Sequence, residues 1–250
     1  MDVLQSSKNP RVKEWKKLHT KKGRDKTGTY LIEGNHLIEE ALKTDHIIEL
    51  MLQNSLPVPD IAIEEQIPVT FISSEISRTI SATETPQGIF AVCKKNVSEP
   101  DPAVHKRFLL LDGVQDPGNI GTMIRTADAA GLDAVIFGEG TGDLYNPKVI
   151  RSAQGSHFHL KFASGSLREW IERFKSHDIP VYGTALCRAA PYKEAAPSEA
   201  FALIVGNEGA GVSEEVLDVT DKNVFIPIYG KSESLNVAVA AGILMYYLRT

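Results

Sequence analysis

Cysteine and metal-binding patterns are nearly absent from this chain of 250 residues. Its two cysteines, Cys93 and Cys187, show no CxxC spacing, so neither a disulfide framework nor a cysteine-based zinc site is indicated. The histidines form no HExxH or other ligand pattern, and we expect no metal. His157 and His159 are expected to lie on one face of a strand as a partly buried pair.

Long hydrophobic runs are also missing. The longest, Val237–Leu248, falls well short of the roughly 20 residues that a membrane-spanning helix needs. The N-terminal stretch has no apolar core resembling a signal peptide, so we expect a cytoplasmic protein. A hydrophobic content of 42% and a charged content of 24% are typical of ordinary globular proteins.

The two common phosphate-binding loops do not occur. Neither GxGxxG nor GxxxxGK[ST] is present, which disfavours a nucleotide-binding oxidoreductase and a Walker-type phosphate site.

Positive charge is concentrated near one end of the chain. Residues 1–30 contain nine basic and three acidic residues, a net charge of +6, whereas the whole chain has a net charge of −5. Clustered Lys and Arg side chains suggest a polyanionic partner, because they release counterions from phosphates. On charge alone, a solvated helix face explains the cluster equally well.

Short strands and helices alternate over the first hundred residues. A basic helix is predicted at 9–19, with Val12, Trp15 and Leu18 on one face, and a polar loop follows at 21–28. After this loop we predict strands at 29–34, 47–52, 68–73 and 88–95, and helices at 36–44, 57–66 and 74–81. The proline-rich, polar stretch 97–106 is expected to be an interdomain linker.

The alternating pattern restarts after this stretch. Predicted strands are 107–111, 133–138, 158–163, 180–186, 201–206 and 223–228, and predicted helices are 119–130, 146–154, 166–177, 213–219 and 234–249. Continuous apolar strands between helices indicate a mostly parallel sheet covered on both faces. We therefore predict an α/β protein with an N-terminal domain at 1–96, the linker at 97–106 and a second domain at 107–250.

Three segments of the second domain pass from an apolar strand through a turn into a helix. They read LLLDGVQDPGNIGTMIRTADAAG (109–131), ALIVGNEGAGVSEE (202–215) and VFIPIYGKSESLNVAVAAGILMYYL (224–248). Because ligands bind at the carboxyl ends of parallel strands, we expect the three turns to form one composite site.

Several polar residues in these segments have both structural and functional interpretations. Asn119 is expected to cap the helix that carries Arg125 and Asp128, and Ser234 to cap the last helix. An arginine near the start of such a helix can meet a phosphate or a ribose hydroxyl. Glu208 makes the second turn a poor anion site and suits ligand groups that donate hydrogen bonds.

Together, the three segments resemble the motifs of the SpoU (TrmH) family of RNA ribose 2′-O-methyltransferases, in the SPOUT class. In motif order, the matching residues are Asn119, Gly121 and Arg125, then Gly206, Glu208 and Gly209, and finally Ser234, Leu235 and Asn236 within the stretch from Ile226 to Ala240. One departure is Ala238, where many members have Ser. More loosely, LIEGNHLIEEAL (31–42) resembles the ribosomal-protein-like substrate-binding domain attached to many members.

The resemblance implies a fold, a cofactor and a partner. It implies a deep trefoil knot formed by the C-terminal strands and helix, a homodimer through the same region, and S-adenosylmethionine as the methyl donor. It places the cofactor near Thr184, Gly206, Ile226 and Leu235.

The resemblance also implies catalytic roles. Arg125 is the expected base; because a guanidinium has a pKa above about 12, it can instead stabilise the developing alkoxide. Asn119, Glu208, Ser234 and Asn236 are expected to orient Arg125 and the ribose.

The expected substrate is ribosomal RNA, by analogy with the family and its attached domain. Candidate RNA-binding residues are Lys8, Arg11, Lys13, Lys16, Lys17, Lys21, Lys22 and Arg24, together with Asn146, Lys148 and Arg151. Two alternatives stay open: a tRNA 2′-O-methyltransferase, and a non-catalytic RNA-binding or ribosome-assembly factor with the same fold.

Overall fold

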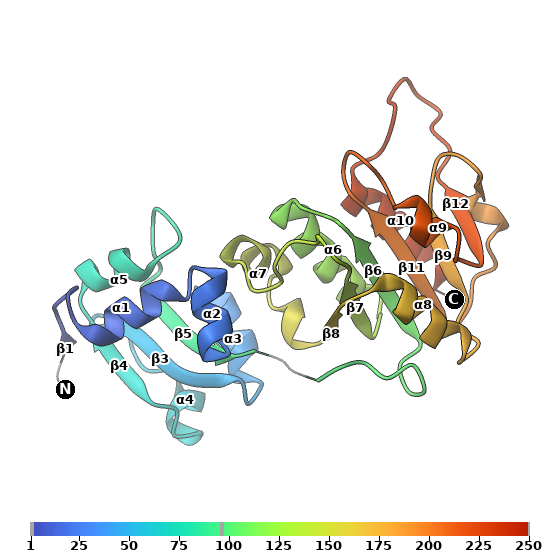
Figure 1. Ribbon diagram of the computed structural model, residues 1–250. Coiled ribbons are helices and arrows are strands. Elements are labelled where there is room, and N and C mark those ends of the chain that lie inside the picture. Colours follow the sequence, from blue (N-terminus) through green and yellow to red (C-terminus); the bar gives the residue numbers. More distant parts are fainter. Residues whose placement is uncertain (1–2, 96–97, 250) are drawn as a thin grey trace. The chain divides into compact units, whose positions relative to one another are not determined.

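The computed structural model describes residues 3–95 and 98–249, which form two compact units (Figure 1). The first unit combines residues 1–96 with 143–158, and the second combines 97–142 with 159–250. Residues 143–158, which the sequence pattern places in the second domain, therefore pack in the first unit. The predicted junction at 96–97 lies outside the described residues.

In the described part of the first unit, five strands form a mixed sheet in the order β1-β4-β3-β5-β2. The central strand β3 pairs in parallel with β4 and antiparallel with β5, which in turn pairs antiparallel with β2. The strands are β1 (Val3–Leu4), β2 (Thr29–Glu33), β3 (Ile47–Gln53), β4 (Val69–Ile72) and β5 (Ile89–Lys94).

Helices cover both faces of this sheet. On one face, Val12, Trp15 and Leu18 belong to an apolar cluster with residues of β3 and β5, which confirms the predicted inward face of the first helix. On the other face, Leu37 and Ile150 belong to a second cluster. The helices are α1 (Pro10–Lys17), α2 (Lys21–Thr27), α3 (Asn35–Leu42), α4 (Asp60–Glu64), α5 (Ser74–Ile80) and α7 (Pro147–Ala153), with a 3-10 turn at Ser156–Phe158.

The prediction of a loop at 21–28 is wrong, since α2 occupies most of this stretch. Thr20 caps the helix by accepting a hydrogen bond from the N–H of Gly23 at 3.1 Å. Gly28 ends the helix with φ +67°, a left-handed conformation that glycine adopts without strain. The buried side chain of Arg24 packs this polar helix against the unit, and such a tertiary contact leaves no hydrophobic period in the sequence.

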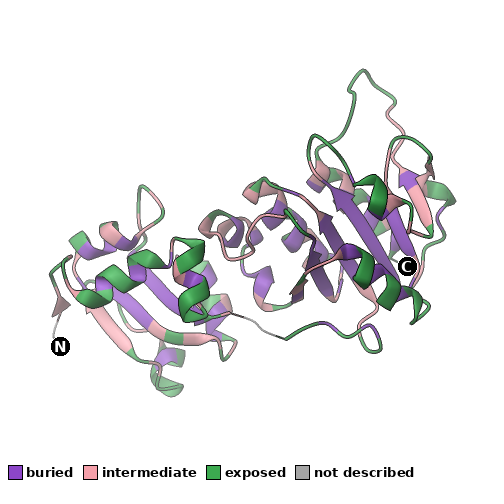
Figure 2. Ribbon diagram, viewed as in Figure 1, coloured by how far each residue is buried: buried purple, intermediate pink, exposed green. Residues whose placement is uncertain are grey.

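In the described part of the second unit, seven strands form a sheet in the order β10-β12-β9-β11-β6-β7-β8. Every neighbouring pair is parallel, which confirms the predicted mostly parallel sheet. All residues of β11 are buried, as expected for a strand covered on both faces (Figure 2). The strands are β6 (Arg107–Asp112), β7 (Ala134–Phe137), β8 (Lys161–Ser164), β9 (Val181–Thr184), β10 (Ala190–Pro191), β11 (Phe201–Gly206) and β12 (Lys222–Phe225).

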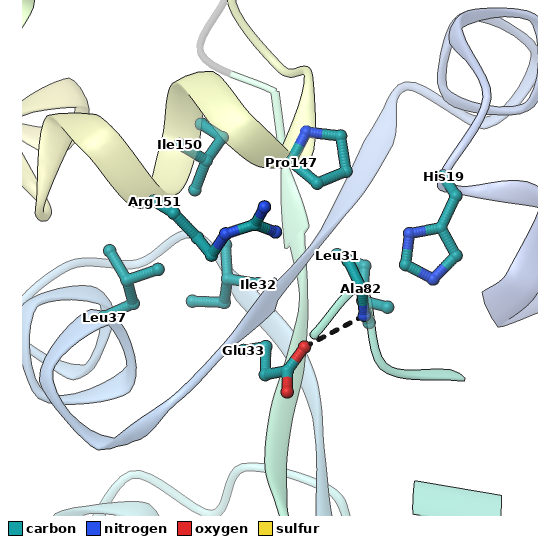
Figure 3. A pocket seen from close by; sticks show the side chains of 9 residues that line it. All are labelled: His19, Leu31, Ile32, Glu33, Leu37, Ala82, Pro147, Ile150 and Arg151. Carbon is teal, nitrogen blue, oxygen red and sulfur yellow. Dashed lines mark hydrogen bonds between the residues drawn. The ribbon is translucent and has the colours of Figure 1, made fainter. Parts of the chain in front are cut away.

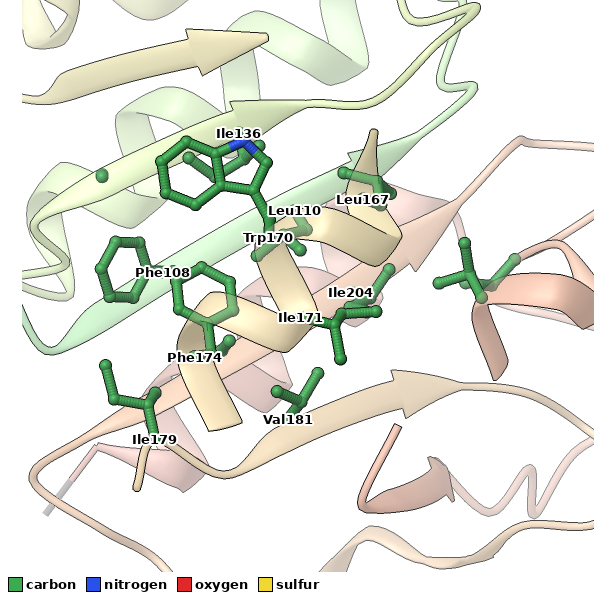
Figure 4. Packing of buried hydrophobic residues seen from close by; sticks show 14 residues of the cluster. Phe108, Leu110, Ile136, Leu167, Trp170, Ile171, Phe174, Ile179, Val181 and Ile204 are labelled. Carbon is green, nitrogen blue, oxygen red and sulfur yellow. The ribbon is translucent and has the colours of Figure 1, made fainter. Parts of the chain in front are cut away.

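The core of the second unit has one helix layer on each side of the sheet. In Figure 4, Trp170 and Phe174 of α8 (Leu167–Lys175) pack against Phe108 of β6, with the rings of Phe108 and Phe174 4.4 Å apart. The short helix α9 (Glu214–Leu217) contributes to the same cluster. Alternate residues of the strands point to the opposite face, where α10 (Val237–Leu248) packs against α6 (Pro117–Ala129) and β11.

Several element boundaries differ from the predicted ranges by a few residues, and two of these shifts have a direct structural cause. The strand predicted at 158–163 begins only at Lys161, because the 3-10 turn precedes it. The helix predicted at 234–249 begins at Val237, because Asn236 is its N-cap. None of the helices in the described stretches has the length and apolar character needed to cross a membrane.

The C-terminal helix α10 is held by the segment that follows the 3-10 turn Tyr192–Glu194. The N–H of Ser198 donates to the carbonyl of Leu248 at 2.9 Å. The hydroxyl of Tyr247 lies 2.9 Å from the carbonyl of Lys193 and 3.1 Å from that of Ala195. The end of α10 is thereby tied to a segment some fifty residues earlier in the chain.

Candidate active site

The first two motifs begin at neighbouring strand ends. Asp112, the last residue of β6, is the register partner of Gly206, the last residue of β11. The carboxylate of Asp112 accepts hydrogen bonds from the backbone N–H of Ser213 at 2.7 Å and from its hydroxyl at 2.8 Å. Ser213 is the N-cap residue of α9, but its hydroxyl makes no capping hydrogen bond and joins α9 to the end of β6 instead.

The second motif is a tight turn built on Asn207 and two glycines. Asn207 and Gly211 exchange backbone hydrogen bonds of 3.0 and 2.9 Å. The side chain of Asn207 accepts from the N–H groups of Gly209 and Ala210 and donates to the carbonyl of Gly113. A Cβ atom at Gly206 would lie 2.0 Å from the backbone of Gly211, so only glycine fits there. This role of Asn207 was not predicted, although an asparagine ahead of a glycine turn is a usual sequence signal for such side-chain hydrogen bonds.

Glu208 joins this turn to the first motif. Its carboxylate accepts hydrogen bonds from the N–H of Gln115 at 3.2 Å, the N–H of Asp116 at 3.0 Å and the side-chain amide of Asn119 at 3.0 Å. Burial raises the pKa of the Glu208 carboxyl, but the hydrogen bonds from Asn119 and the backbone outweigh burial, so that the pKa is lowered. Glu208 is therefore a carboxylate whose hydrogen-bond donors come from the protein itself.

Asn119 and Asn236 join the first motif to the third. The amide N–H of Asn236 donates to the side-chain oxygen of Asn119 at 2.9 Å. The side-chain oxygen of Asn236 caps α10 by accepting from the N–H groups of Ala238 and Val239. A continuous chain of hydrogen bonds thus runs from Glu208 through Asn119 to Asn236 and brings the three motifs together, as expected.

Two predicted caps are wrong. The residue that caps α6 is Asp116, whose carboxylate accepts from the N–H of Asn119 at 2.8 Å. Asn236, and not Ser234, caps α10. Ala238, where many family members have Ser, is buried at the start of α10. Its backbone N–H donates to the side-chain oxygen of Asn236, a hydrogen bond that needs no hydroxyl at position 238.

Arg125 lies apart from this chain of hydrogen bonds. It follows Asn119 by six residues, roughly 9 Å along α6. Its side chain is exposed, and its guanidinium makes no hydrogen bond or ion pair with any residue in 3–95 or 98–249. The next turn of α6 carries Asp128, whose carboxylate lies 2.9 Å from Nδ1 of His159. Arg125 is thus a cation available to a ligand or a partner.

The predicted cofactor-binding residues border the carboxyl ends of β9, β11 and β12. Thr184 ends β9 and donates its hydroxyl to the carbonyl of Ile204 at 3.0 Å. Three large apolar side chains in the segments that follow β9 and β12 are exposed: Leu186 at 72%, Tyr229 at 92% and Leu235 at 37%. In the described chain, the backbone N–H groups of residues 228–235 donate no hydrogen bond. Free backbone donors beside uncovered apolar side chains suit a nucleoside.

Most of the predicted RNA-binding cations are exposed on the first unit. Lys13, Lys16 and Lys17 on α1 point away from the core, and so do Lys8 and the α2 residues Lys21 and Lys22. Arg11 is exposed but pairs with Glu49. The prediction that Arg24 binds RNA is wrong. Its side chain is 2% exposed, pairs with Asp143 and donates a hydrogen bond to the carbonyl of Leu18, so it cannot reach RNA.

The predicted residues 146–151 lie on α7. Asn146 caps this helix by accepting a hydrogen bond from the N–H of Lys148, which accounts for its side-chain oxygen. Lys148 is exposed and Arg151 is half-buried, whereas Val149 and Ile150 face the core.

The two histidines predicted on one strand face are separate. His157 is buried in the 3-10 turn with Nε2 3.0 Å from the hydroxyl of Tyr30, whereas His159 is exposed beside Asp128. Within the described ranges, no group of three or more His, Cys, Asp or Glu side chains could hold a metal ion.

Comparison with known proteins finds related families and sequences. Residues 106–246 match the model of the SpoU rRNA methylase family, and residues 9–91 match an MRM3-like substrate-binding domain. The chain is 53% identical over its full length to the full length of the 23S rRNA (guanosine(2553)-2′-O)-methyltransferase RlmP of Bacillus subtilis (strain 168).

Two crystal structures with bound cofactor are also similar. The AdoMet-bound rRNA methyltransferase of Sinorhizobium meliloti matches with a TM-score of 0.88 and 29% identity, over 99% of this chain and 97% of that one. The SpoU methyltransferase AviRb of Streptomyces viridochromogenes in complex with AdoMet matches with a TM-score of 0.86 and 26% identity, over 96% and 97% of the two chains.

Proposed function

Because the chain belongs to the SpoU rRNA methylase family, we propose that it transfers a methyl group from S-adenosylmethionine to the ribose 2′-OH of a guanosine in 23S rRNA. The observation that carries the proposal is the chain of hydrogen bonds from Glu208 through Asn119 to Asn236. It assembles all three family motifs at the strand ends where ligands of parallel sheets bind.

The proposed cofactor site fits the chemistry of the loops after β9 and β12. The free N–H groups of residues 228–235 would hold the adenosine, and Leu186 and Leu235 would cover its apolar faces. Thr184 and Ile226 would contribute at the strand ends, while Gly206 permits the tight turn beside them. When bound, S-adenosylmethionine supplies an activated sulfonium methyl group.

The protein must then place the 2′ oxygen and handle its proton. The guanidinium of Arg125 stabilises negative charge developing on this oxygen and contacts the adjacent phosphate, and the proton leaves to water. Glu208 and Asn119 set the loop that leads into α6, and Ser234 and Asn236 set the start of α10. Most of the rate enhancement then comes from positioning.

Arg125→Ala tests the catalytic assignment. Transfer of tritiated methyl groups should fall by at least about 100-fold, since an electrostatic stabiliser of this kind contributes on that order. Calorimetric titration should give an unchanged affinity for S-adenosylmethionine. Arg168→Ala, which removes an exposed arginine of α8, serves as the control. Near-normal turnover by the Arg125 variant would remove this residue from the mechanism.

The homodimer is part of the same proposal. The outer face of α10 carries Val239, Ile243 and Tyr246 at helical spacing, and they are 52%, 38% and 58% exposed. A second copy of the chain that covers this face would bring its own groups close to Arg125 and α6. We also propose the trefoil knot, which the hydrogen bonds from the 193–198 segment to the end of α10 support.

The two regions of the chain have different proposed tasks. Residues 1–96 bind the RNA substrate, residues 97–106 link the regions, and residues 107–250 carry out methyl transfer. The exposed lysines of α1 and α2 contact RNA phosphates. A ribosomal RNA substrate places the protein in the cytoplasm.

An acceptor comparison tests the substrate class. Purified protein with tritiated S-adenosylmethionine should label 23S rRNA transcripts, and should leave 16S rRNA and tRNA transcripts unlabelled. Labelling of tRNA alone would favour the tRNA alternative, and no labelling with no cofactor binding would favour a non-catalytic assembly factor.

A further inference from the structure

Residues 143–158 are an integral part of the first unit. The guanidinium of Arg24 is buried, pairs with Asp143 and donates to the carbonyl of Leu18 at 2.7 Å. At the other end of the segment, the buried ring of His157 lies 3.0 Å from the hydroxyl of Tyr30. Between them, Ile150 is 1% exposed in the apolar cluster on this face of the sheet. These contacts fix α7 against the first unit.

This packing brings two side chains that are distant in the sequence to one hollow. Arg151 of α7 and His19, from the connection between α1 and α2, both line it, although they are far apart in the sequence (Figure 3). The carbonyl of Ile80 accepts a hydrogen bond from Nε2 of His19 at 2.8 Å and so orients the ring. The remaining lining residues are Leu31, Ile32, Glu33, Leu37, Ala82, Pro147 and Ile150.

The charges in the hollow are not balanced. Glu33 is the acid that lines it, and its carboxylate already accepts hydrogen bonds from the hydroxyls of Ser81 at 2.7 Å and Thr83 at 2.8 Å and from the N–H of Ala82 at 3.1 Å. The guanidinium of Arg151, by contrast, donates no hydrogen bond to any residue in the described ranges. A half-buried cation without a partner favours an anionic ligand.

The size of the hollow limits what this ligand can be. Its free volume is about 10 Å³, roughly that of one water molecule, which excludes a base. An oxygen atom of a phosphate fits at its mouth. Exposed lysines of α1 and α2, Lys16, Lys17, Lys21 and Lys22, flank His19 in the chain.

We propose that this hollow is a subsite for a backbone phosphate of the RNA substrate, with Arg151 as the residue that binds it and His19 as its opposite wall. The subsite rests on the proposed function only in that the phosphate belongs to RNA. It makes α7, encoded between the first and second family motifs, part of the RNA-binding surface of the first unit.

The salt dependence of RNA binding tests the subsite. Affinity for a 23S rRNA transcript is measured between 50 and 200 mM NaCl for the wild type and for Arg151→Gln, which removes the charge but keeps most of the side chain. The loss of one phosphate contact should weaken binding about 3- to 10-fold at low salt and reduce the slope of log K against log salt by roughly 0.7 to 0.9. Arg151→Lys should retain most of the slope.

Controls separate this proposal from the proposed function. Arg168→Ala removes an exposed arginine of α8 and should leave the RNA slope unchanged. All variants should bind S-adenosylmethionine like the wild type, and inorganic phosphate at the concentration of the RNA phosphates should not compete. An unchanged slope in Arg151→Gln overturns the subsite even if methylation proceeds. An altered slope in a protein that transfers no methyl group keeps the subsite and overturns the proposed function.

Discussion

Glu208 illustrates how one motif is fastened to another through a carboxylate. Its carboxylate accepts hydrogen bonds from two N–H groups of the loop between β6 and α6 and from the side chain of Asn119 in α6, and these hydrogen bonds lower its pKa despite partial burial. A group with a lowered pKa in the folded state stabilises the protein above its ordinary pKa. This contribution disappears as the pH falls through the lowered value.

Glu208→Gln should therefore destabilise the protein most at neutral pH. The difference in urea midpoint between wild type and variant should be largest near pH 7 and should shrink below about pH 4, the ordinary carboxyl range. Glu84→Gln, at an exposed glutamate, should show no such difference at either pH. A difference that grows on acidification would contradict the lowered pKa.

The side chain of Asn236 has two separable roles, because its oxygen caps α10 and its N–H group donates to Asn119. Asn236→Ala should cost about 1 kcal/mol of stability through loss of the cap. Asn236→Asp keeps the capping oxygen, so it should be nearly as stable as the wild type but strongly impaired in methyl transfer. Thermal unfolding and tritium transfer measure the two effects. An active Asp variant would show that the contact with Asn119 is dispensable.

At the residue scale, the sequence was enough to predict that Asn119, Glu208 and Asn236 meet. Their order at strand-to-helix junctions of a parallel sheet is sufficient for that conclusion. The division of labour among them was not predictable, since Asp116, Asn119, Ser234 and Asn236 are all acceptable capping residues. Only the hydrogen bonds of the folded protein show which of these neighbouring residues caps each helix.

At the scale of elements, hydrophobic runs predicted the strands of the second unit because they are buried on both faces. Helix α8 was predictable for the complementary reason, since Leu167, Trp170, Ile171 and Phe174 repeat at helical spacing. Helix α2 was not, because its one buried side chain is an arginine and its other residues are mostly polar. A short polar helix held by a buried ion pair carries no periodic signal.

The turn after β11 depends on the absence of a side chain at Gly206. Gly206→Ala places a Cβ atom 2.0 Å from backbone that has no room to move, and should cost about 1–3 kcal/mol or more of unfolding free energy. Gly230→Ala, where nothing lies within 4 Å of the added atom, is the matched control and should change stability by less than about 0.5 kcal/mol. Equal stability of the two variants in urea unfolding would contradict the close packing of this turn.

For the molecule as a whole, the unexpected feature is that residues 143–158 pack in the first unit and not in the second. The pattern of this segment, a capped amphipathic helix, does not reveal which core receives its apolar face. The deciding contacts come from Arg24 and Tyr30, more than a hundred residues earlier in the chain. Contacts between residues so far apart in the chain cannot be predicted from a single sequence.

The proposed dimer depends on the exposed apolar face of α10. Ile243→Glu places a charge at the centre of this face, and should convert a dimer into a monomer and reduce methyl transfer at least about tenfold. Light scattering at micromolar concentration measures the state of assembly. Val104→Glu, at an apolar side chain that is 71% exposed elsewhere, should leave it unchanged. A wild-type protein that is monomeric in this measurement would contradict the proposed homodimer.

Mapping 2′-O-methyl groups in ribosomal RNA is the decisive test for methylation of a 23S rRNA ribose by this protein. RNA from cells with and without the protein is compared at nucleotide resolution. The expected result is one guanosine of 23S rRNA that loses its 2′-O-methyl group without the protein. Wild-type protein should restore it, and the Arg125→Ala variant should not. Identical 2′-O-methylation of 23S rRNA in both cells would contradict the account.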